Sequence, residues 1–342
     1  MFLKNKHKFL RIFLICIALF LVISLVFTLV SPIPVSYLIR LTFNKSMAVA
    51  PENFDEMQNR VDVLKDLSYP SKYSDNTADI YVPKSENGNS NNTFPVILWI
   101  HGGAFVGGSK KDVEIYATAL AAEGFAVVCM NYRRAPEAKY PTPLVQANDV
   151  YLWMKSVSDI YSFDISRFIL AGDSAGAHVA AQFAAIQSNT AYAAEMGFEQ
   201  VVPIDTLKAA LLFCGPFDVE LLDKSSNSIM NFFIGRAAWA YFGSKEWSEK
   251  SAHQATISNH ITNDFPPTFI TDGNNLSFEE HGRDLVDVLK QNGVHVESYF
   301  IPADIETAAH EYQFIMNTKA GAESFRRVVS FLEMQSDAIL QK

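Results

Sequence analysis

The sequence predicts an α/β protein in which helices cover both faces of a mostly parallel sheet, with a lid over the sheet and a transmembrane helix at the N-terminus. Three observations predict it: an uncharged apolar run near the start, a long alternation of apolar runs with amphipathic stretches, and two segments that interrupt the alternation. The chain has 342 residues, of which 49% are hydrophobic and 19% charged. This composition excludes a disordered or collagen-like chain, and the length suits one α/β domain with additions.

The first expected element is an apolar helix. The cations Lys4, Lys6, Lys8 and Arg11 precede residues 12–30, which carry no charge. At a rise of about 1.5 Å per residue this run is roughly 28 Å long, close to the hydrocarbon thickness of a bilayer. A cleaved signal peptide is the alternative, but its apolar part is usually about 7–15 residues and ends at a small-residue site that is missing here. Residues 1–30 are therefore predicted to be a cytoplasmic basic tail and a transmembrane signal anchor.

The distribution of charge orients this anchor and limits its partners. Cations precede the span and none follows it before Arg40, which places the rest of the chain on the extracytoplasmic side. Beyond residue 30 the chain has 24 basic and 37 acidic residues, a net charge of about −13. So acidic a body disfavours nucleic acid and anionic headgroups as partners. We expect a membrane-anchored protein, or a secreted one if the helix is cleaved.

The central elements follow from an alternation that begins at Asp79. Near-continuous apolar runs separated by helical patterns are typical of a parallel sheet buried on both faces. The expected strands are 80–82, 95–100, 125–130, 168–171, 209–214, 269–271 and 296–301. The expected helices are 112–122, 143–157, 175–187, 277–291 and 320–334.

Two segments do not fit the alternation. Residues 31–75 are predicted to be a linker and the N-terminal part of a lid, and residues 215–265 a lid insertion, both lying over the sheet edge. The second segment holds an aromatic patch, IMNFFIGRAAWAYFG, which either forms the core of the lid or lines a substrate site.

The cysteines and histidines favour neither disulfides nor metal. Cys16 lies in the apolar span, and Cys129 and Cys214 lie in expected buried strands, where a thiol behaves as a small apolar group. The sequence contains no C-x-x-C and no H-E-x-x-H pattern. We expect two buried thiols and no zinc site.

The strand expected at 168–171 leads directly into Gly172-Asp173-Ser174-Ala175-Gly176 and then a helix. The order strand, G-x-S-x-G, helix is that of a nucleophile elbow, because the glycines permit a tight turn that lifts the Ser174 hydroxyl clear of the sheet. A second motif, His101-Gly102-Gly103, follows the strand expected at 95–100. Paired glycines there let backbone N–H groups point at a developing oxyanion.

From Asp79 to the C-terminus, the chain resembles the hormone-sensitive-lipase-like branch of the α/β-hydrolase fold, a family of serine carboxylesterases. Five segments occur in the family order: HGGAF (101–105), NYRRAPEAKYPTPLVQANDV (131–150), GDSAGAHVAA (172–181), FPPTFIT (265–271) and AAHEYQF (308–314). An anchor ahead of such a domain is also similar to arylacetamide-deacetylase-type esterases. The resemblance implies an α/β-hydrolase domain over residues 76–342 that needs no cofactor.

The resemblance also implies site residues. Ser174 matches the nucleophile and His310 the general base, while Gly102, Gly103 and Ala175 match the backbone donors of the oxyanion hole. Three positions depart from the family pattern, because Ala104, Ala177 and Glu311 stand where the family usually has glycine. The first two substitutes are small, whereas Glu311 puts a carboxylate beside the base, where it either raises the pKa of His310 or points to solvent.

The acid of the triad has several candidates, because a gapless match puts Leu276 where the family has aspartate. Asp272 directly follows an expected strand at the carboxyl end of a parallel sheet, where such sites are built. Ser277 and Glu280 form an S-x-x-E capping box, and Glu279 lies in the first helical turn, so both glutamates have structural explanations. Asp272 is the preferred acid, with Glu279, Glu280 or no acid as alternatives.

These residues predict a serine hydrolase that cleaves esters of short to medium acyl chains through an acyl-enzyme, or a deacetylase of amides or sugars at the cell surface. Two alternatives remain: a non-catalytic ligand-binding homologue, suggested by the displaced acid, and an interfacial lipase, suggested by the anchor and the aromatic patch.

Overall fold

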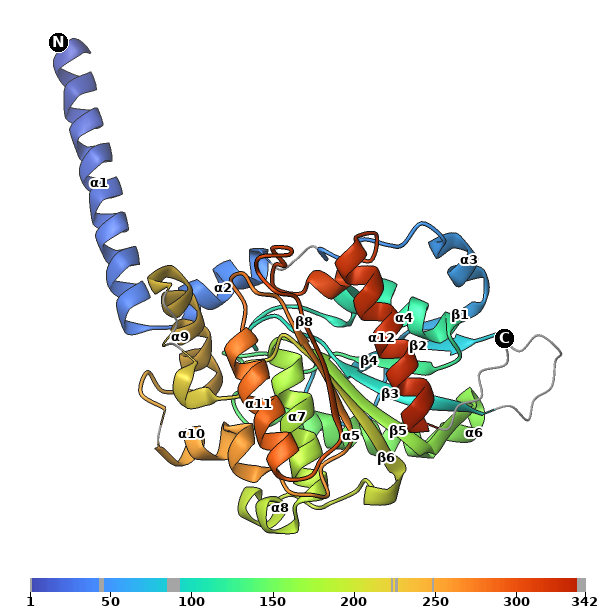
Figure 1. The fold of residues 1–342 in the computed structure, drawn as a ribbon. Coiled ribbons are helices and arrows are strands. Elements are labelled where there is room, and N and C mark those ends of the chain that lie inside the picture. The colour runs from blue at the N-terminus through green and yellow to red at the C-terminus, as the bar shows by residue number, and fades with distance from the viewer. Residues whose placement is uncertain are drawn as a thin grey trace.

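A computed structural model describes residues 2–42, 46–84, 93–222, 224, 227–247 and 249–336. Its centre is an eight-stranded sheet in the order β1-β2-β4-β3-β5-β6-β7-β8 (Figure 1). The strands are β1 (Val61–Ser68), β2 (Thr77–Pro83), β3 (Phe94–Ile100), β4 (Ala126–Met130), β5 (Phe163–Asp173), β6 (Leu207–Phe213), β7 (Thr268–Asp272) and β8 (Val296–Phe300). The pairs from β4 to β8 are parallel, and β1 and β2 add an antiparallel edge. The predicted mostly parallel sheet is confirmed.

Helices cover both faces of this sheet, and alternate strand residues point to each. On β3, Val96, Leu98 and Ile100 join the core beneath α5 (Thr142–Ser156), α7 (Ala175–Ser188) and α11 (Glu279–Gln291). Ile97 and Trp99 join the core beneath α4 (Glu114–Ala122) and α12 (Lys319–Ser336). Because both faces are buried, the strands appear in the sequence as continuous apolar runs.

The edge strand β1 corrects one expectation. Residues 31–75 were expected to lie outside the sheet, but β1 pairs with β2 and extends it. Only Val61 of β1 is fully buried, so this strand has neither the continuous apolar run of a central strand nor a regular alternation. Its position in the sheet depends on backbone pairing more than on side-chain burial.

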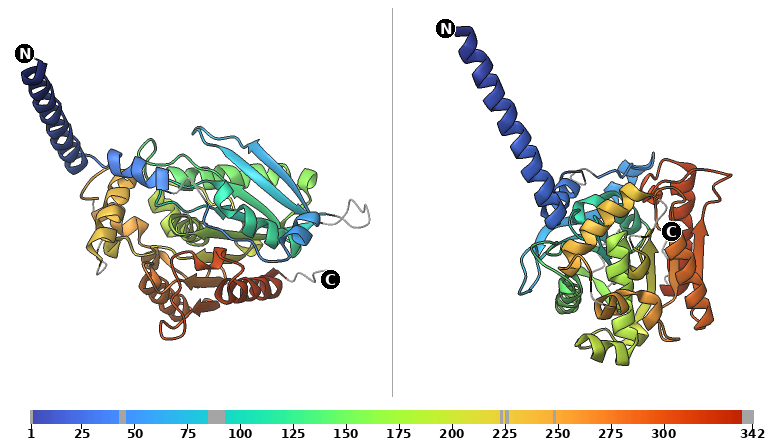
Figure 2. Two further views of the ribbon diagram at one scale, coloured as in Figure 1. Left: turned by 90° about the horizontal axis from the view of Figure 1, so that it is seen from above. Right: turned by 90° about the vertical axis from the view of Figure 1, so that its left-hand side faces the viewer.

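At the N-terminus, α1 (Phe2–Val30) is followed after two residues by α2 (Ile33–Thr42). Residues 8–30 of α1 are long and apolar enough to cross a membrane and are not covered by the rest of the chain; a signal sequence would pass the same test. Figure 2 shows α1 leaving the domain near α2 and α9 (Ser228–Phe242).

The shorter elements connect the sheet to the lid and surround it. They are α3 (Phe54–Asn59), α6 (Ser158–Tyr161), α8 (Thr190–Met196), α10 (Glu249–Ala255) and the 3₁₀ turns η1 (Lys110–Val113), η2 (Ile204–Thr206), η3 (Val219–Leu221), η4 (Ile257–His260) and η5 (Tyr312–Phe314). Between β6 and β7, α9, α10, η3 and η4 occupy the segment expected to be the lid insertion. The thiols of Cys129 and Cys214 are free and buried, as predicted.

Candidate active site

Ser174 occupies the sharp turn between β5 and α7. Its backbone has φ 51° and ψ −123°, a conformation that residues other than glycine rarely adopt. Such strained conformations are found mainly at functional turns. The first turn of α7 lies so close to β3 that a Cβ on Gly176 would be 2.0 Å from the carbonyl oxygen of Ile100. Glycine is therefore required at that position for the helix to approach the sheet.

His310 reaches Ser174 from a loop between β8 and η5. Its Nε2 atom lies 3.0 Å from the Ser174 Oγ, a hydrogen-bond distance. Burial lowers the pKa of His310 to about 4, so the ring is neutral near pH 7. A neutral ring with a proton on Nδ1 leaves Nε2 able to accept the Ser174 proton.

Behind His310, a hydroxyl separates the ring from the acid. The Ser277 Oγ lies 2.6 Å from the His310 Nδ1 and also donates to the Oδ1 of Asp272, the last residue of β7. The Ser277 hydroxyl can accept from Nδ1–H and donate to the carboxylate at the same time. The four side chains therefore form one hydrogen-bonded series: Ser174, His310, Ser277, Asp272.

This position of Ser277 overturns the predicted capping box. The helix α11 begins at Glu279 with Phe278 as its N-cap, so Ser277 lies outside the helix. Its hydroxyl is already engaged by His310 and Asp272 and does not cap the helix. Sequence reasoning missed its role, although one signal was available: Ser277 directly follows Leu276, where the family places its acid.

The two other acids lie away from this series. Glu279 accepts hydrogen bonds from Arg283, at 2.8 Å from Nε and 2.5 Å from Nη2. Glu280 is exposed on α11. Asp272, in contrast, is buried, and burial raises its pKa to about 7.

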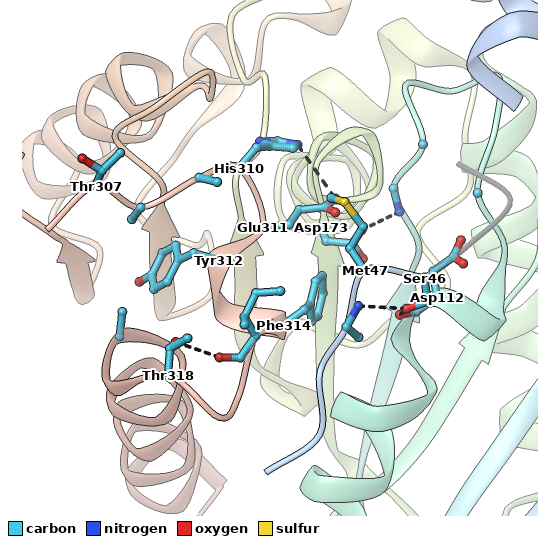
Figure 3. A pocket seen from close by; sticks show the side chains of 18 of the residues that line it. Ser46, Met47, Asp112, Asp173, Thr307, His310, Glu311, Tyr312, Phe314 and Thr318 are labelled. Atoms are coloured by element: carbon cyan, nitrogen blue, oxygen red, sulfur yellow. Dashed lines mark hydrogen bonds and ion pairs between the residues drawn. The ribbon is translucent and has the colours of Figure 1, made fainter. Parts of the chain in front are cut away.

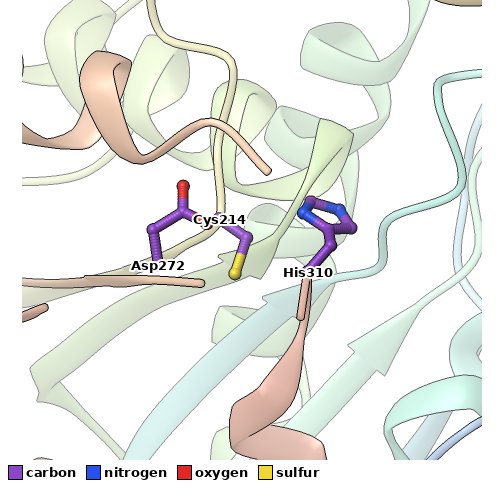
Figure 4. Close-up of side chains that lie close together, drawn as sticks. All are labelled: Cys214, Asp272 and His310. Atoms are coloured by element: carbon purple, nitrogen blue, oxygen red, sulfur yellow. The ribbon is translucent and has the colours of Figure 1, made fainter. Parts of the chain in front are cut away.

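Cys214, Asp272 and His310 lie close together, and each has one ligand-type atom within 4.8 Å of those of the other two (Figure 4). To bind a metal, this cluster would have to supply a ring nitrogen of His310 and the thiolate of Cys214. Both nitrogens of His310 are engaged, by Ser174 and Ser277, and burial raises the pKa of the Cys214 thiol well above its usual value. Because a protonated thiol is a poor ligand, we assign this cluster to the acid end of the hydrogen-bonded series.

Of the backbone N–H groups predicted to form the oxyanion hole, one already donates a hydrogen bond within the protein. The Gly102 N–H donates to the Oδ2 of Asp173 at 2.7 Å, so this group holds the turn and is not directed at a substrate. Ala175 begins α7 beside Ser174, and Gly103 has φ +108°, which favours glycine. Ala104 lines the cavity that contains Ser174 and Ala175, which makes its backbone N–H a further candidate donor beside Ser174.

Glu311 turns inward and not to solvent. Its carboxyl shares a hydrogen bond with Asp173, whose Oδ1 accepts from the Trp99 indole N–H at 2.7 Å. The Oε1 of Glu311 lies 3.8 Å from the His310 Nε2. Burial and the neighbouring Asp173 raise the pKa of Glu311 well above its usual value, and burial raises that of Asp173 to about 6. The pair therefore holds one shared proton near neutral pH.

Because this proton is shared in the folded state, we expect the free energy of unfolding to depend on pH. Folded Glu311 keeps a proton that the unfolded chain loses near pH 4.5, so the folded state binds more protons and the free energy of unfolding falls as pH rises above that value. Glu311→Gln keeps a donor for Asp173 and cannot ionise. We expect the free energy of unfolding of Glu311→Gln, relative to wild type, to increase between pH 5 and pH 8, by about 1.4 kcal/mol for each unit of pKa difference that is removed. Thermal unfolding at both pH values measures this difference, with exposed Glu280→Gln as the control. The same difference at both pH values would contradict the shared-proton interpretation.

Two cavities meet at His310. The larger, about 670 Å³, has mostly apolar walls from α2 and α9 and contains Ser174. The smaller, about 310 Å³, lies on the side of Gly103, Asp173 and Glu311 (Figure 3). The aromatic patch of the lid is divided between two environments: Phe233 lines the larger cavity, and Tyr241 is buried in the core. His310 therefore borders two separate spaces, of which the larger also contains Ser174.

The comparisons with known proteins give the family and the fold. A family model described as BD-FAE matches residues 78–278. This chain belongs to the BD-FAE family. One curated relative of this BD-FAE chain is the probable carboxylic ester hydrolase LipM of Mycobacterium tuberculosis. The two sequences are 26% identical over 259 residues, which cover 75% of this chain and 57% of LipM. Another is the probable carboxylesterase 6 of Arabidopsis thaliana, 34% identical over 115 residues, 32% of this chain and 34% of the relative.

Solved structures share the fold of this BD-FAE chain. Esterase B of Lactobacillus rhamnosis, in an inhibited form, superposes with a TM-score of 0.71 at 22% identity, covering 85% of this chain and 90% of the esterase. A bacterial heroin esterase gives a TM-score of 0.65 at 22% identity, covering 82% and 86%. These likenesses confirm the α/β-hydrolase fold, and the named relatives agree with the resemblance to carboxylesterases. The chain spans 57% of LipM and about a third of carboxylesterase 6.

Proposed function

We propose that this protein is a serine carboxylesterase. The observation that carries the proposal is the 3.0 Å contact between the Ser174 Oγ and the His310 Nε2, with Asp272 behind the ring through Ser277. The names of the relatives agree with this activity. Ser174 would be the nucleophile, His310 the general base and Asp272 the acid.

The mechanism follows from the hydrogen-bonded series. As Ser174 attacks the ester carbonyl, His310 takes its proton on Nε2 and becomes an imidazolium. Asp272 stabilises that cation through Ser277, while backbone N–H groups near Gly103, Ala104 and Ala175 face the negative oxygen. His310 then returns the proton to the leaving alcohol, and a water molecule repeats the cycle to release the acid from Ser174.

The larger cavity suggests the kind of ester. Its walls are nearly all apolar, and its volume of about 670 Å³ accommodates an acyl chain of short to medium length beside Ser174. The smaller cavity, which contains Glu311 and Asp173, would take the alcohol. We infer esters of short to medium acyl chains as substrates.

The test is hydrolysis of a p-nitrophenyl acyl series from acetate to palmitate by the full-length protein in detergent micelles. We expect turnover that is highest for short to medium chains and that Ser174→Ala abolishes. The wild-type and variant proteins should bind the same esters with similar affinity, because the hydroxyl is small. Binding without Ser174-dependent turnover at any chain length would instead favour a non-catalytic ligand-binding homologue.

We further propose that residues 1–30 remain attached as a membrane anchor, with the α/β domain, which includes β1, on the extracytoplasmic side and lid segments contributed by α2 and by residues 215–265. The exposed apolar α1 supports the anchor. The alternative is secretion after cleavage. The N-terminal sequence of the protein isolated from membranes distinguishes the two, since an intact start at Met1 is expected only for the anchor.

A further inference from the structure

We propose that the larger cavity opens toward the bilayer at the end of α1, so that the enzyme takes its ester from the membrane leaflet and not from water. This inference deepens the proposed function and rests on it, since Ser174 and His310 must be reactive. Its occupant is the acyl part of a membrane-resident lipid ester, and its docking surface is the bilayer itself.

The end of α1 is fastened to the lid. Arg236 of α9 donates from Nη1 to the carbonyl oxygen of Leu29 at 3.3 Å. The same guanidinium lies over the rings of Phe232 and Trp239, at 5.2 and 5.1 Å from their centroids. Arginine and tryptophan are typical of the membrane–water interface, where the charge meets headgroups and the ring lies between lipid and water. This contact places α9 at the level where α1 would leave the bilayer.

The same two helices form the wall of the larger cavity. Leu38 and Ile39 of α2 and Phe233 of α9 line it, with Ser174 and His310 among the other lining residues. The ten residues of α2 span about 15 Å and begin only two residues after α1 ends. The cavity wall therefore lies within about one short helix length of the predicted membrane surface.

Apolar side chains also cover the outside of this region. Leu41 of α2 is 70% exposed, Ile229 of α9 is 71% exposed, and Tyr37, Phe232 and Leu276 are also exposed. A group of exposed apolar side chains beside a cavity marks an interaction surface. Because the body beyond residue 30 carries a net charge of about −13, an anionic surface would repel it, so the contact must be apolar and suits a zwitterionic leaflet.

Direct entry would remove a cost that a lipid ester otherwise faces. Each CH₂ group of an acyl chain favours lipid over water about four-fold, so a diglyceride with two medium-length chains is almost absent from water. A cavity that opens at the interface lets the chain pass between two apolar environments. The anchor adds to this effect by holding the enzyme at a high local concentration of membrane substrate.

The experiment uses the full-length protein in phosphatidylcholine vesicles with two substrates: didecanoylglycerol, a medium-chain ester within the vesicles, and p-nitrophenyl butyrate in the water. The test variant is Leu41→Ser with Phe232→Ser, because neither side chain lines the cavity. The control is Ile160→Ser on α6, which is 71% exposed and lies at the other end of the domain from α1 (Figure 1).

We expect the double variant to lose about ten-fold in rate on didecanoylglycerol, because two apolar contacts with the leaflet are removed, with p-nitrophenyl butyrate hydrolysis and the Ile160→Ser control unchanged. Equal rates of the double variant and wild type on didecanoylglycerol would overturn membrane entry, as would no hydrolysis of didecanoylglycerol by wild type. A wild-type protein inactive on both esters would instead reject the proposed esterase function.

Discussion

Asp272→Asn is expected to lower kcat on p-nitrophenyl butyrate by a factor on the order of 10⁴. In wild type, the carboxylate accepts from Ser277, which leaves the Ser277 oxygen free to accept from His310 Nδ1–H. An amide can donate its NH₂ to Ser277, which turns the hydroxyl proton toward Nδ1. The ring then carries its proton on Nε2 and cannot accept one from Ser174. The loss should therefore fall on kcat and leave KM nearly unchanged.

The pH dependence of kcat/KM gives this prediction a second measurement. Burial raises the pKa of Asp272 to about 7 and lowers that of His310 to about 4. The acid is ionised only above its raised pKa, so the rate should increase as pH rises through about 7, whereas His310 alone would limit the rate only near pH 4. Asp272→Asn should lose the limb near pH 7. Exposed Glu280→Gln serves as the control, and a profile of Asp272→Asn identical to wild type would reject Asp272 as the acid.

Ser277→Ala is expected to lower kcat by about 10²–10³, a smaller loss because the charge of Asp272 remains but no longer reaches the ring through a hydrogen bond. The change also leaves a buried carboxylate without its hydroxyl donor, which costs about 1–3 kcal/mol of stability. Stability alone would not alter the kcat of the folded enzyme. Measuring kcat below the unfolding temperature therefore separates the two effects.

Two further variants sharpen the role of Ser277. Ser277→Thr keeps the hydroxyl and should restore most of the activity that Ser277→Ala loses. The double change Ser277→Ala with Asp272→Asn should be no worse than Asp272→Asn alone, because residues that act as one series are not additive. Two results would show that Ser277 does not connect Asp272 to His310. One is a loss of kcat in the double variant equal to the product of the two single losses, and the other is an inactive Ser277→Thr together with an active Ser277→Ala.

The fold could be predicted because its strands are buried on both faces and so appear as apolar runs, of which β3 is the clearest. The elbow could be predicted because close contact requires glycine at positions such as Gly176. The link through Ser277 could not, since it depends on how residues 273–276 turn after β7. Asn275 forms a bridge with Ala309, the neighbour of His310, and this pairing brings Ser277 under the ring. No local spacing encodes a pairing across 34 residues.

The direction of the Glu311 side chain could not be predicted from the sequence either. Its position beside His310 was visible, but the side chain turns toward Asp173 through a backbone conformation with φ 61° that the sequence does not reveal. The Arg236 contact with α1 was equally hidden, since it joins residues far apart in the chain. Patterns of three or four residues reveal elements and turns, whereas contacts between distant loops depend on the packed domain.

The hydrogen bond from the Gly102 N–H to Asp173 has a consequence for the timing of catalysis. Asp173 precedes the nucleophile and is held by Trp99 from inside the sheet, so one carboxylate ties the turn after β3 to the turn after β5. The loop that we propose faces the developing oxyanion is thus ordered when the protein folds, before any ester arrives. Substrate binding then has little loop entropy to overcome, and the dipoles around Ser174 need little rearrangement as the transition state forms.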